Sequence, residues 1–246
     1  LFNIMTSTLS VLSMAAGKGT RMKSARPKVL HTLAGQSLLQ HVLNAVAGLQ
    51  ADQTLLIVGH GADAVRASVA GSSALCVLQE PQLGTGHAVQ QAVPHLPDTG
   101  TTLILNGDVP LIEAATARAL AAACGGTKLA LLTIELADAT GYGRIVRNGK
   151  QEVRAIVEHK DASEAERAIR EVYTGMLAAP TAWLKRAVMA LDNKNAQKEF
   201  YLTDVVKHAV AAGTQVVAVK TEDAVQVAGV NSPVQLQELE REHQRR

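Results

Sequence analysis

The sequence has few of the features that mark nucleic-acid or membrane-surface binding. Aromatic side chains make up 2% of the 246 residues, and 24 basic and 22 acidic residues leave a formal net charge of +2. Scarce aromatic residues argue against a base-stacking surface for single-stranded nucleic acid. A balanced charge excludes recognition of nucleic acid or of a membrane surface by electrostatics alone. We therefore expect no nucleic-acid partner and no membrane partner.

Cysteine and long hydrophobic runs are also scarce. Cys76 and Cys124 lie far apart and outside any CxxC or Cys/His cluster, which is typical of reduced thiols and argues against a structural zinc site. No apolar run reaches the length of about 18 residues that a membrane span needs. The uncharged segment 1–17 lacks the basic start of a secretory signal, so we interpret it as a core strand. The sequence predicts a cytoplasmic protein.

The rest of the composition is that of a globular protein, with 47% apolar and 19% charged residues. Short apolar runs alternate with longer helical patterns, which predicts an α/β fold with a Rossmann-like, mostly parallel sheet flanked by helices. The expected strands are Leu9–Met14, Thr54–Val58, Ala74–Leu78, Thr102–Leu105, Lys128–Ile134 and Val216–Val219. The expected helices are Ser37–Leu49, Ala62–Val69, Gly86–Val93, Glu113–Ala123 and Leu202–Ala211.

The middle of the chain follows a different pattern. Segments Tyr142–Val146 and Glu152–Glu158 flank Asn148-Gly149, which is a hairpin signal, and a polar helical stretch follows from Ala162 to Ile169. We interpret this region as a small mixed α/β lobe over the sheet.

The first candidate site is the segment Ala15-Ala16-Gly17-Lys18-Gly19-Thr20-Arg21-Met22. Glycines after a strand let backbone amides approach a phosphate, although a turn in any α/β protein has the same spacing. A dinucleotide GxGxxG pattern fails at Met22, and a Walker loop fails because Lys18 follows its glycine too early. Arg21 and the later Arg26-Pro27-Lys28 favour a triphosphate site, because cations and amides would meet at one sheet edge.

The second candidate is Asp108, which follows the apolar strand Leu103–Leu105. A carboxylate at the carboxyl end of such a strand stands where α/β sheets bind ligands. Mg²⁺ prefers one or two protein oxygens together with water and substrate phosphates, so Asp108 is suited to hold it. The alternative is that Asp108 only caps the turn that follows.

The third candidate is the segment from Gln79 to Ala88, in which Gly84 and Gly86 flank Thr85 before a helix. Such a loop can enclose a base or bring backbone amides to its edge. Gln79 offers both a donor and an acceptor, the pair needed to recognise uracil. We interpret His87 as a surface residue of the first helical turn and place it outside the site.

The fourth candidate combines three short strings, Gly141-Tyr142-Gly143-Arg144, Val157-Glu158-His159-Lys160-Asp161 and Tyr173-Thr174-Gly175. We interpret these strings as the lining of a polar pocket, in which Glu158 could accept hydrogen bonds from vicinal hydroxyls. Taken singly each is a weak signal, because charge clusters usually lie on solvated faces. Asn231 adds an amide oxygen just before the last expected helix.

Together these strings resemble the signature of the sugar-phosphate nucleotidyltransferases. The strings Gln82-Leu83-Gly84-Thr85-Gly86-His87-Ala88, Gly107-Asp108-Val109-Pro110-Leu111 and Gly229-Val230-Asn231 narrow the resemblance to the uridylyltransferase half of the bacterial GlmU family. Members of that family are N-acetylglucosamine-1-phosphate uridylyltransferases and glucosamine-1-phosphate acetyltransferases. The resemblance covers nearly the whole chain in the right order.

The resemblance implies a nucleotide-diphospho-sugar transferase fold with a sugar-binding lobe. It also implies Mg²⁺-dependent synthesis of UDP-N-acetylglucosamine and pyrophosphate from UTP and N-acetylglucosamine 1-phosphate, for peptidoglycan and lipopolysaccharide synthesis. The resemblance implies that Arg21 and Lys28 act on the UTP phosphates in catalysis and that Asp108 and Asn231 bind Mg²⁺. The residues implied to bind the nucleotide are Ala15, Ala16, Gly17, Gly19, Gln79, Gly84, Thr85 and Asn106. The residues implied to bind the sugar are Gly143, Glu158, Tyr173, Thr174 and Asn231.

Two positions depart from the family pattern. The chain has Tyr173-Thr174-Gly175 where the family commonly has Asn-Thr-Gly, so an amide contact to the sugar is missing or replaced. It has Asn106 where a tyrosine commonly precedes Gly-Asp, which changes one contact facing the ligand.

The end of the chain predicts a domain boundary. Ser232 as N-cap and Pro233 at the first helical position predict a polar helix over Pro233–Arg246. We expect residues 1–231 to form the uridylyltransferase domain and residues 232–246 to begin a connector helix. The family's trimerising acetyltransferase half, a left-handed β-helix, has no counterpart in this sequence. We therefore expect a homotrimer only for a longer parent protein, and a monomer or weak dimer for this truncated chain.

Three other functions remain open at this point. A related nucleotidyltransferase would use CTP, dTTP or another sugar phosphate. A binding domain without catalysis would have no need of both Asp108 and Asn231. A dinucleotide-dependent oxidoreductase would need the glycine pattern that fails here.

Overall fold

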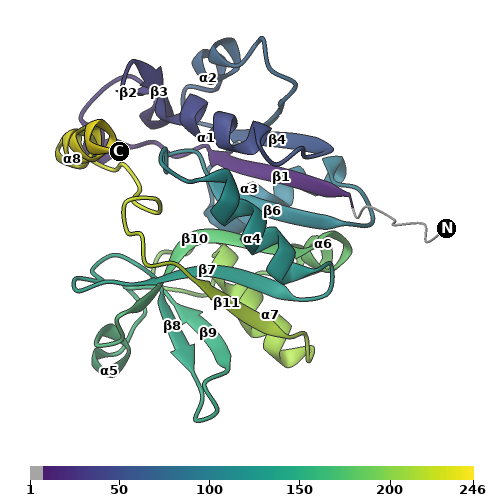
Figure 1. Ribbon diagram of the computed structural model, residues 1–246. Coiled ribbons are helices and arrows are strands. Elements are labelled where there is room, and N and C mark those ends of the chain that lie inside the picture. Colours follow the sequence, from purple (N-terminus) through teal and green to yellow (C-terminus); the bar gives the residue numbers. More distant parts are fainter. Residues whose placement is uncertain (1–7) are drawn as a thin grey trace.

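The computed structural model describes residues 8–246 and contains a nine-stranded sheet (Figure 1). The strand order along its main path is β11-β7-β10-β6-β1-β4-β5. These strands are β1 (Leu9–Ala15), β4 (Gln53–Val58), β5 (Leu75–Leu78), β6 (Thr101–Asn106), β7 (Leu129–Glu135), β10 (Glu171–Pro180) and β11 (Val216–Lys220). Six of the seven match strands expected from the apolar runs. Of the core strand expected over residues 1–17, the part before residue 8 lies outside the described residues.

The sheet is mostly parallel, as predicted. β1 pairs in parallel with β4 and β6, β4 with β5, and β7 with β11. Along the main path the exception is β10, which runs antiparallel between β6 and β7 and was not among the expected strands. Its pairing with β7 shifts register between Tyr173 and Leu177, and Gly175 in that interval has φ +89°. This irregularity interrupts the strand pattern in the sequence.

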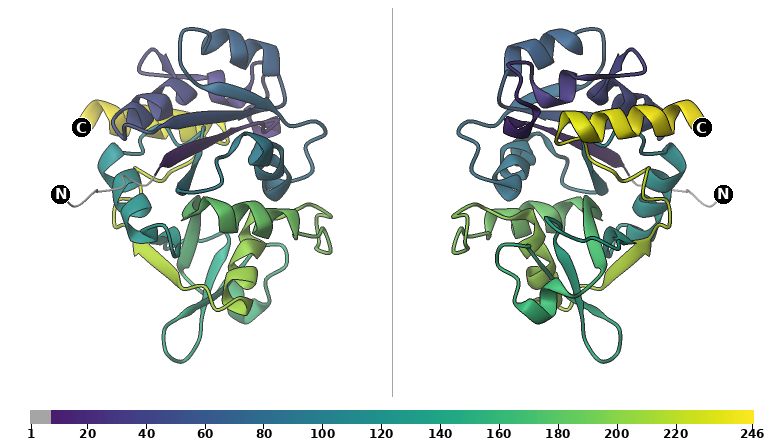
Figure 2. Two further views of the ribbon diagram at one scale, coloured as in Figure 1. Left: turned by 90° about the vertical axis from the view of Figure 1, so that its right-hand side faces the viewer. Right: turned by 90° about the vertical axis from the view of Figure 1, so that its left-hand side faces the viewer.

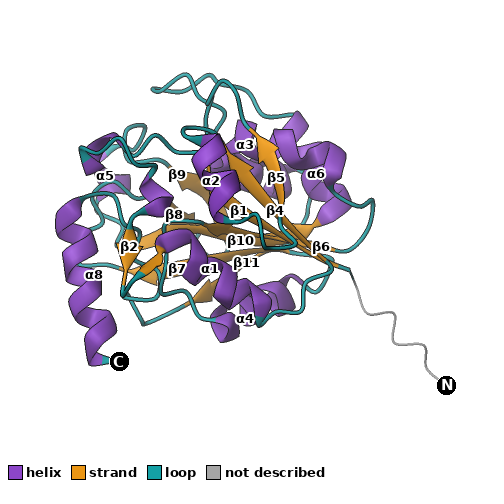
Figure 3. Ribbon diagram, turned by 90° about the horizontal axis from the view of Figure 1, so that it is seen from above, coloured by secondary structure: helices purple, strands orange, loops and turns teal. Residues whose placement is uncertain are grey.

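Helices cover both faces of the sheet (Figure 3). One face is buried by α3 (Thr85–Ala92), α6 (Thr181–Met189) and α7 (Val205–Ala211), and the other by α1 (Leu38–Ala47), α2 (Ala62–Ser68) and α4 (Ala114–Cys124). Alternate residues of β1 supply both cores, since Leu12 packs toward the first set and Val11 toward the second. Helix α6 was not predicted, and the other five agree with the expected helices to within a few residues.

The expected small lobe is a hairpin of β8 (Arg144–Arg147) and β9 (Val153–Val157) with the short helix α5 (Glu164–Arg167) (Figure 1). Arg144 of β8 pairs with Val172 of β10, so the lobe continues the main sheet rather than lying over it as a separate layer. Helix α5 is shorter than expected, and a capping box between Ser163 and Glu166 fixes its start.

The last helix, α8 (Pro233–Arg245), begins as predicted with Ser232 as N-cap and Pro233 in the first turn. It buries Leu239 against Met22, Leu33 and Leu38. Figure 2 shows it lying across one side of the molecule, beside the small hairpin of β2 (Thr32–Leu33) and β3 (Gln36–Ser37). Among residues 8–246, no helix combines the length and apolar character needed to cross a membrane.

The parallel strands bring the predicted motifs to one edge of the sheet. The glycine loop follows β1, Gln79 follows β5, and Asp108 follows β6. Because β6, β1, β4 and β5 are consecutive neighbours, their carboxyl ends open on the same side, where α/β sheets bind ligands.

Candidate active site

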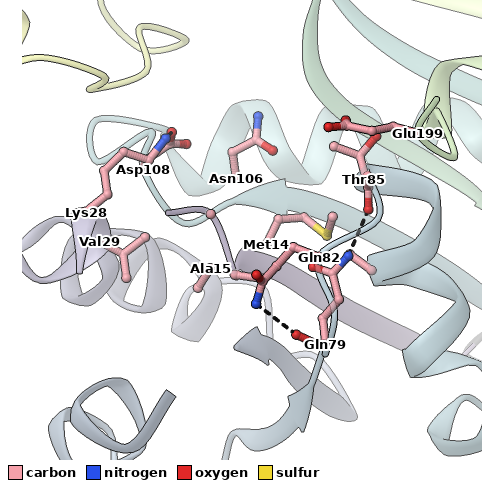
Figure 4. Close-up of a pocket in the computed structure, with 14 residues that line it drawn as sticks. Met14, Ala15, Lys28, Val29, Gln79, Gln82, Thr85, Asn106, Asp108 and Glu199 are labelled. Carbon is pink, nitrogen blue, oxygen red and sulfur yellow. Dashed lines mark hydrogen bonds and ion pairs between the residues drawn. The ribbon is translucent and has the colours of Figure 1, made fainter. Parts of the chain in front are cut away.

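A cavity of about 360 Å³ lies at this edge of the sheet (Figure 4). Three separate loops and strand ends form its walls, so one ligand would touch all of them. The predicted residues that line it are Ala15, Ala16, Gly17, Lys28, Gln79, Gly84, Thr85, Asn106 and Asp108. Gln82 and Ala88, which belong to the third candidate segment but had no assigned role, line it as well, and so do Met14, Val29 and Glu199, which sequence reasoning missed.

Gly19 lies beside this cavity and acts through Lys28. Its φ is +59°, and a Cβ at this position would lie 2.6 Å from the Cβ of Lys28. Only glycine allows both the left-handed backbone and this close approach. Gly19 therefore lets the loop after β1 fold against Lys28 and sets the position of its side chain.

The Lys28 ammonium contacts two side-chain oxygens. Its Nζ donates to Asp108 Oδ2 and, over 3.1 Å, to Asn231 Oδ1. The Lys28 and Asp108 side chains are 14% and 17% exposed, so this ion pair is largely shielded from water. The carboxylate oxygen and the amide oxygen that the resemblance assigns to one metal site therefore lie around one point, which the Lys28 ammonium occupies.

With the Lys28 ammonium turned away from them, these two oxygens would fit a magnesium ion. One carboxylate and one amide oxygen are the kind of partial shell that Mg²⁺ completes with water and phosphate oxygens. Gly229 lies next to both ligands, because a Cβ there would be 3.9 Å from Asp108 Oδ2 and 3.6 Å from Asn231 Nδ2, and it leaves room for such a shell. Within residues 8–246 no group of three or more His, Cys, Asp or Glu is placed to enclose a metal completely.

A second cavity of about 190 Å³ adjoins the first. Asn106 and Asp108 line both cavities, so the two meet at the end of β6. Its other walls include Arg21, Thr174 and Asn231 from the predicted site. Thr174 is fixed there, because its hydroxyl donates to Leu132 O over 2.9 Å and its carbonyl accepts from Asn106 Nδ2 over 3.2 Å.

Gly143, Glu158 and Tyr173 form a separate group, where the small lobe meets β10, that lines neither cavity. A Cβ on Gly143 would lie 3.7 Å from both carboxylate oxygens of Glu158, and Tyr173 N donates to Gly143 O over 2.9 Å. Thr203, which sequence reasoning missed, donates its hydroxyl to Glu158 Oε1 over 2.9 Å. Burial raises the pKa of Glu158, and nearby acidic residues raise it further.

The Tyr173 hydroxyl is buried and has no hydrogen-bond partner among the described residues. Burial, followed by the nearby Glu158 charge, raises the pKa of this phenol well above its ordinary value, so it stays protonated. The departure from the family's asparagine thus places an unpaired O–H group beside Glu158.

Comparison with known proteins places this geometry in a family. Residues 11–195 match the family described as the MobA-like NTP transferase domain, which is more than half of the chain. The chain belongs to this family. The NTP transferase domain therefore includes the glycine loop, Gln79, Asp108, Glu158 and Tyr173, and the chain is a nucleotidyltransferase.

Curated relatives agree with the resemblance seen in the motifs. The bifunctional protein GlmU of Methylibium petroleiphilum is 63% identical over 245 residues, and that of Polaromonas naphthalenivorans is 62% identical over 248 residues. Each comparison covers 97% of this chain, but only 53% and 52% of the relative. This NTP transferase domain thus spans about half the length of the curated relatives it matches, and the resemblance to the GlmU family is confirmed.

Solved structures confirm the fold. A UDP-glucose pyrophosphorylase complexed with UDP-glucose superposes with a TM-score of 0.78 at 14% identity, over 97% of this chain and 99% of that one. A nucleotidyl transferase from Methanothermobacter superposes with a TM-score of 0.69 at 19% identity, over 97% and 98%. The NTP transferase domain therefore has the nucleotide-diphospho-sugar transferase fold.

Proposed function

We propose that this chain is a Mg²⁺-dependent uridylyltransferase. It would convert UTP and N-acetylglucosamine 1-phosphate into UDP-N-acetylglucosamine and pyrophosphate in the cytoplasm, for peptidoglycan and lipopolysaccharide synthesis. The observation that carries the proposal is the meeting of two cavities at Asn106 and Asp108. One cavity contains Gln79 and the glycine loop, and the other contains Arg21 and Asn231, so a nucleotide and a second phosphate would meet at Asp108.

The larger cavity suits UTP. Gln79, Gly84 and Thr85 would surround the uracil, and the backbone from Ala15 to Gly17 would approach the phosphates. Thr85 is held in place for this role, because its Oγ1 accepts from Leu202 N over 3.0 Å.

The small lobe suits the sugar. We propose that Glu158 accepts from a sugar hydroxyl with the oxygen that Thr203 leaves free, and that Gly143 leaves room beside that carboxylate. Tyr173 would stand beside Glu158 at this site, but its buried hydroxyl does not reach the space that a sugar would occupy, so it does not replace the donor of the family's asparagine in this conformation. Thr174 and Asn231 would contact the sugar phosphate from the smaller cavity.

The chemistry needs no protein base, because a phosphate oxygen of the sugar 1-phosphate is already a nucleophilic anion. This oxygen would attack the α-phosphorus of UTP, and the bond from the α-phosphorus to the α,β-bridging oxygen would break to release pyrophosphate. The obstacle is repulsion between anions, so catalysis is positioning and charge neutralisation. Lys28 and Arg21 would neutralise the phosphates, and the glycine loop would orient them. A magnesium ion on Asp108 and Asn231 would supply further neutralisation between the two substrates.

The remaining proposals concern the whole protein. Residues 1–231 would form the transferase domain, and residues 232–246 would begin a connector. A longer parent would be a homotrimer, whereas this chain would be a monomer or weak dimer without a nucleic-acid or membrane partner. Size-exclusion chromatography with light scattering would test the oligomeric state directly.

Substrate pairing tests the proposed function. Pyrophosphate release is measured with UTP, CTP or dTTP, each combined with N-acetylglucosamine 1-phosphate or glucose 1-phosphate, with and without Mg²⁺. We expect release that requires Mg²⁺ and is fastest for UTP with the N-acetylated sugar. A different preferred pair would indicate a related nucleotidyltransferase. No release by a folded protein that binds UTP would indicate a binding domain and contradict the proposal.

A further inference from the structure

His87 contacts the side chain that is assigned to the base. It lies in α3, partly buried, with its Nδ1 3.2 Å from Gln79 Nε2. Gln79 Nε2 also donates to Gly84 O over 2.9 Å. On the other side of the imidazole, the side-chain amide of Gln91 lies 3.1 Å from Nε2. The sequence had suggested only a surface residue of the first helical turn.

Hydrogen-bonding chemistry leaves one consistent arrangement for these groups. Gly84 O can only accept, so the Gln79 amide must turn its nitrogen toward it. The second N–H of that nitrogen points at His87 Nδ1, which must then be the unprotonated acceptor of a neutral ring. The ring hydrogen is then on Nε2, which cannot accept from the Gln91 amide nitrogen placed 3.1 Å away, so this arrangement requires the Gln91 amide to be turned with its oxygen toward Nε2. Burial lowers the pKa of His87, which favours this neutral ring.

The surrounding loop holds this arrangement in place. Gly86 N donates to Phe200 O over 2.7 Å, and Phe200 N donates to Leu83 O over 2.8 Å. The Phe200 ring lies against His87, with 6.3 Å between the ring centroids. At Gly84, where φ is +110°, a Cβ would lie 2.6 Å from Phe200 O, so only glycine lets the loop lie this close to the Phe200 backbone. The acceptor carbonyl and the imidazole therefore have defined positions relative to Gln79.

The consequence is that Gln79 offers the cavity an acceptor and no donor. Both of its N–H groups are bound, to Gly84 O and His87 Nδ1, and only Oε1 is left. The N3 atom of uracil carries a hydrogen and can donate to Oε1, whereas N3 of cytosine is an acceptor and would face a second acceptor. Turning the amide to suit cytosine would break both bonds and set Oε1 against Gly84 O.

We propose that His87 is a specificity-positioning residue, which fixes the Gln79 amide as an acceptor and so makes the site reject cytidine nucleotides. This inference rests on the proposed function, in which Gln79 faces the base. His87 acts through Gln79 and not on the reacting phosphates. Its removal should therefore change the choice of base more than the rate with the correct nucleotide.

Two substitutions at His87 separate positioning from packing. His87→Leu keeps an apolar body but removes the acceptor, whereas His87→Asn retains an amide oxygen near the position of Nδ1. We expect the ratio of UTP to CTP affinity, measured by calorimetry on the full chain, to fall about tenfold in His87→Leu and to be largely restored in His87→Asn. His95→Leu, at an exposed histidine beyond α3, is the matched control and should keep the wild-type ratio.

Several results would overturn the inference. One is an unchanged ratio in folded His87→Leu, and another is an equal loss in the Leu and Asn variants, which would mean a packing role. If His87→Leu does not fold, nitrogen NMR of the wild-type protein with labelled histidine still shows which ring nitrogen of His87 carries the hydrogen. We expect the neutral tautomer with hydrogen on Nε2, and a hydrogen on Nδ1 would refute the arrangement. A wild-type protein that binds UTP no better than CTP would instead contradict the proposed function on which the inference rests.

Discussion

At the residue scale, Lys28 lies where the proposed phosphate site meets the proposed metal site. Its ammonium lies between Asp108 Oδ2 and Asn231 Oδ1, at the boundary of the two cavities. A cation at this point holds the two oxygens together and offsets the charge of the carboxylate. It also stands where the phosphates of both substrates would meet.

Lys28→Ala should therefore reduce turnover more than sugar affinity. We expect kcat to fall about a hundredfold, because a positioned charge in a shielded site is lost, while KM for the sugar phosphate changes little. Steady-state kinetics with both substrates varied would measure the two effects. Lys23→Ala, in the same loop but exposed, is the control. An unchanged kcat in Lys28→Ala would remove this residue from the phosphate site.

Asp108→Asn should leave the fold intact and weaken both metal binding and turnover. The substitution keeps the side-chain volume but removes the single carboxylate at the proposed Mg²⁺ site, so we expect turnover to fall by about a hundredfold or more. Turnover against Mg²⁺ concentration would be measured beside the exposed variant Asp63→Asn. Near-normal activity with the wild-type Mg²⁺ dependence would refute the metal assignment.

Glu158 gives a prediction about pH. Burial raises the pKa of this carboxyl above its ordinary value of 4.5, so the folded protein holds the proton more tightly than the unfolded chain. Glu158 contributes its full stabilisation below pH 4.5, and this stabilisation is lost as the pH rises through the raised pKa of the folded protein. Relative to Glu158→Gln, the free energy of unfolding of the wild type should therefore fall between pH 4.5 and that raised pKa. Denaturant unfolding of both proteins over a pH series would measure this, and parallel pH profiles would contradict it.

The site residues that were predicted and those that were missed differ in kind. Gln79, Asp108 and the glycine loop follow apolar strands directly, so local sequence marks them. Glu199 and Thr203 reach the site from a loop far along the chain, and only the tertiary fold brings them there. His87 was visible in a predicted motif, but its role depends on a bond to a side chain eight residues away.

At the element scale, β10 determines how the two lobes are joined. It pairs with β6 and β7 of the main sheet and with β8 of the small lobe, so one strand connects the two. Its irregularity at Gly175 brings the chain against Asn106, where a Cβ would lie 2.2 Å from Nδ2.

Gly175→Ala should therefore destabilise the protein and move Asn106. A side chain at φ +89° is strained and would clash with the Asn106 amide, so we expect a loss of about 2 kcal/mol or more in the free energy of unfolding. Gly149→Ala, with no atom within 4 Å of its added Cβ, is the control and should stay within about 0.5 kcal/mol. Urea unfolding of the two variants would test this, and equal stabilities would contradict the role given to Gly175.

The elements that sequence reasoning found are those with a simple apolar pattern. The buried parallel strands and the helices between them follow from runs of valine, leucine and isoleucine. Strand β10 did not, because it changes register around Gly175 and α6 begins directly after Pro180, its last residue. Strand order could not be predicted either, since pairing depends on contacts between segments far apart in the chain.

At the scale of the whole molecule, one mixed sheet joins the cavity edge of the parallel strands to the small lobe (Figure 1). The α/β class and the mostly parallel sheet followed from the sequence, and the family resemblance was confirmed by relatives 62–63% identical. The meeting of two cavities at Asp108 was visible only in the folded chain. The central claim is that a sugar phosphate attacks UTP at that point.

The most direct measurement follows the phosphorus of the sugar. N-acetylglucosamine 1-phosphate with radiolabelled phosphorus is incubated with UTP, Mg²⁺ and the chain, and the products are separated. The account predicts that all transferred label appears in UDP-N-acetylglucosamine and that the pyrophosphate released in equal amount is unlabelled. Label in pyrophosphate or in free phosphate, or no labelled nucleotide sugar at all, would contradict it.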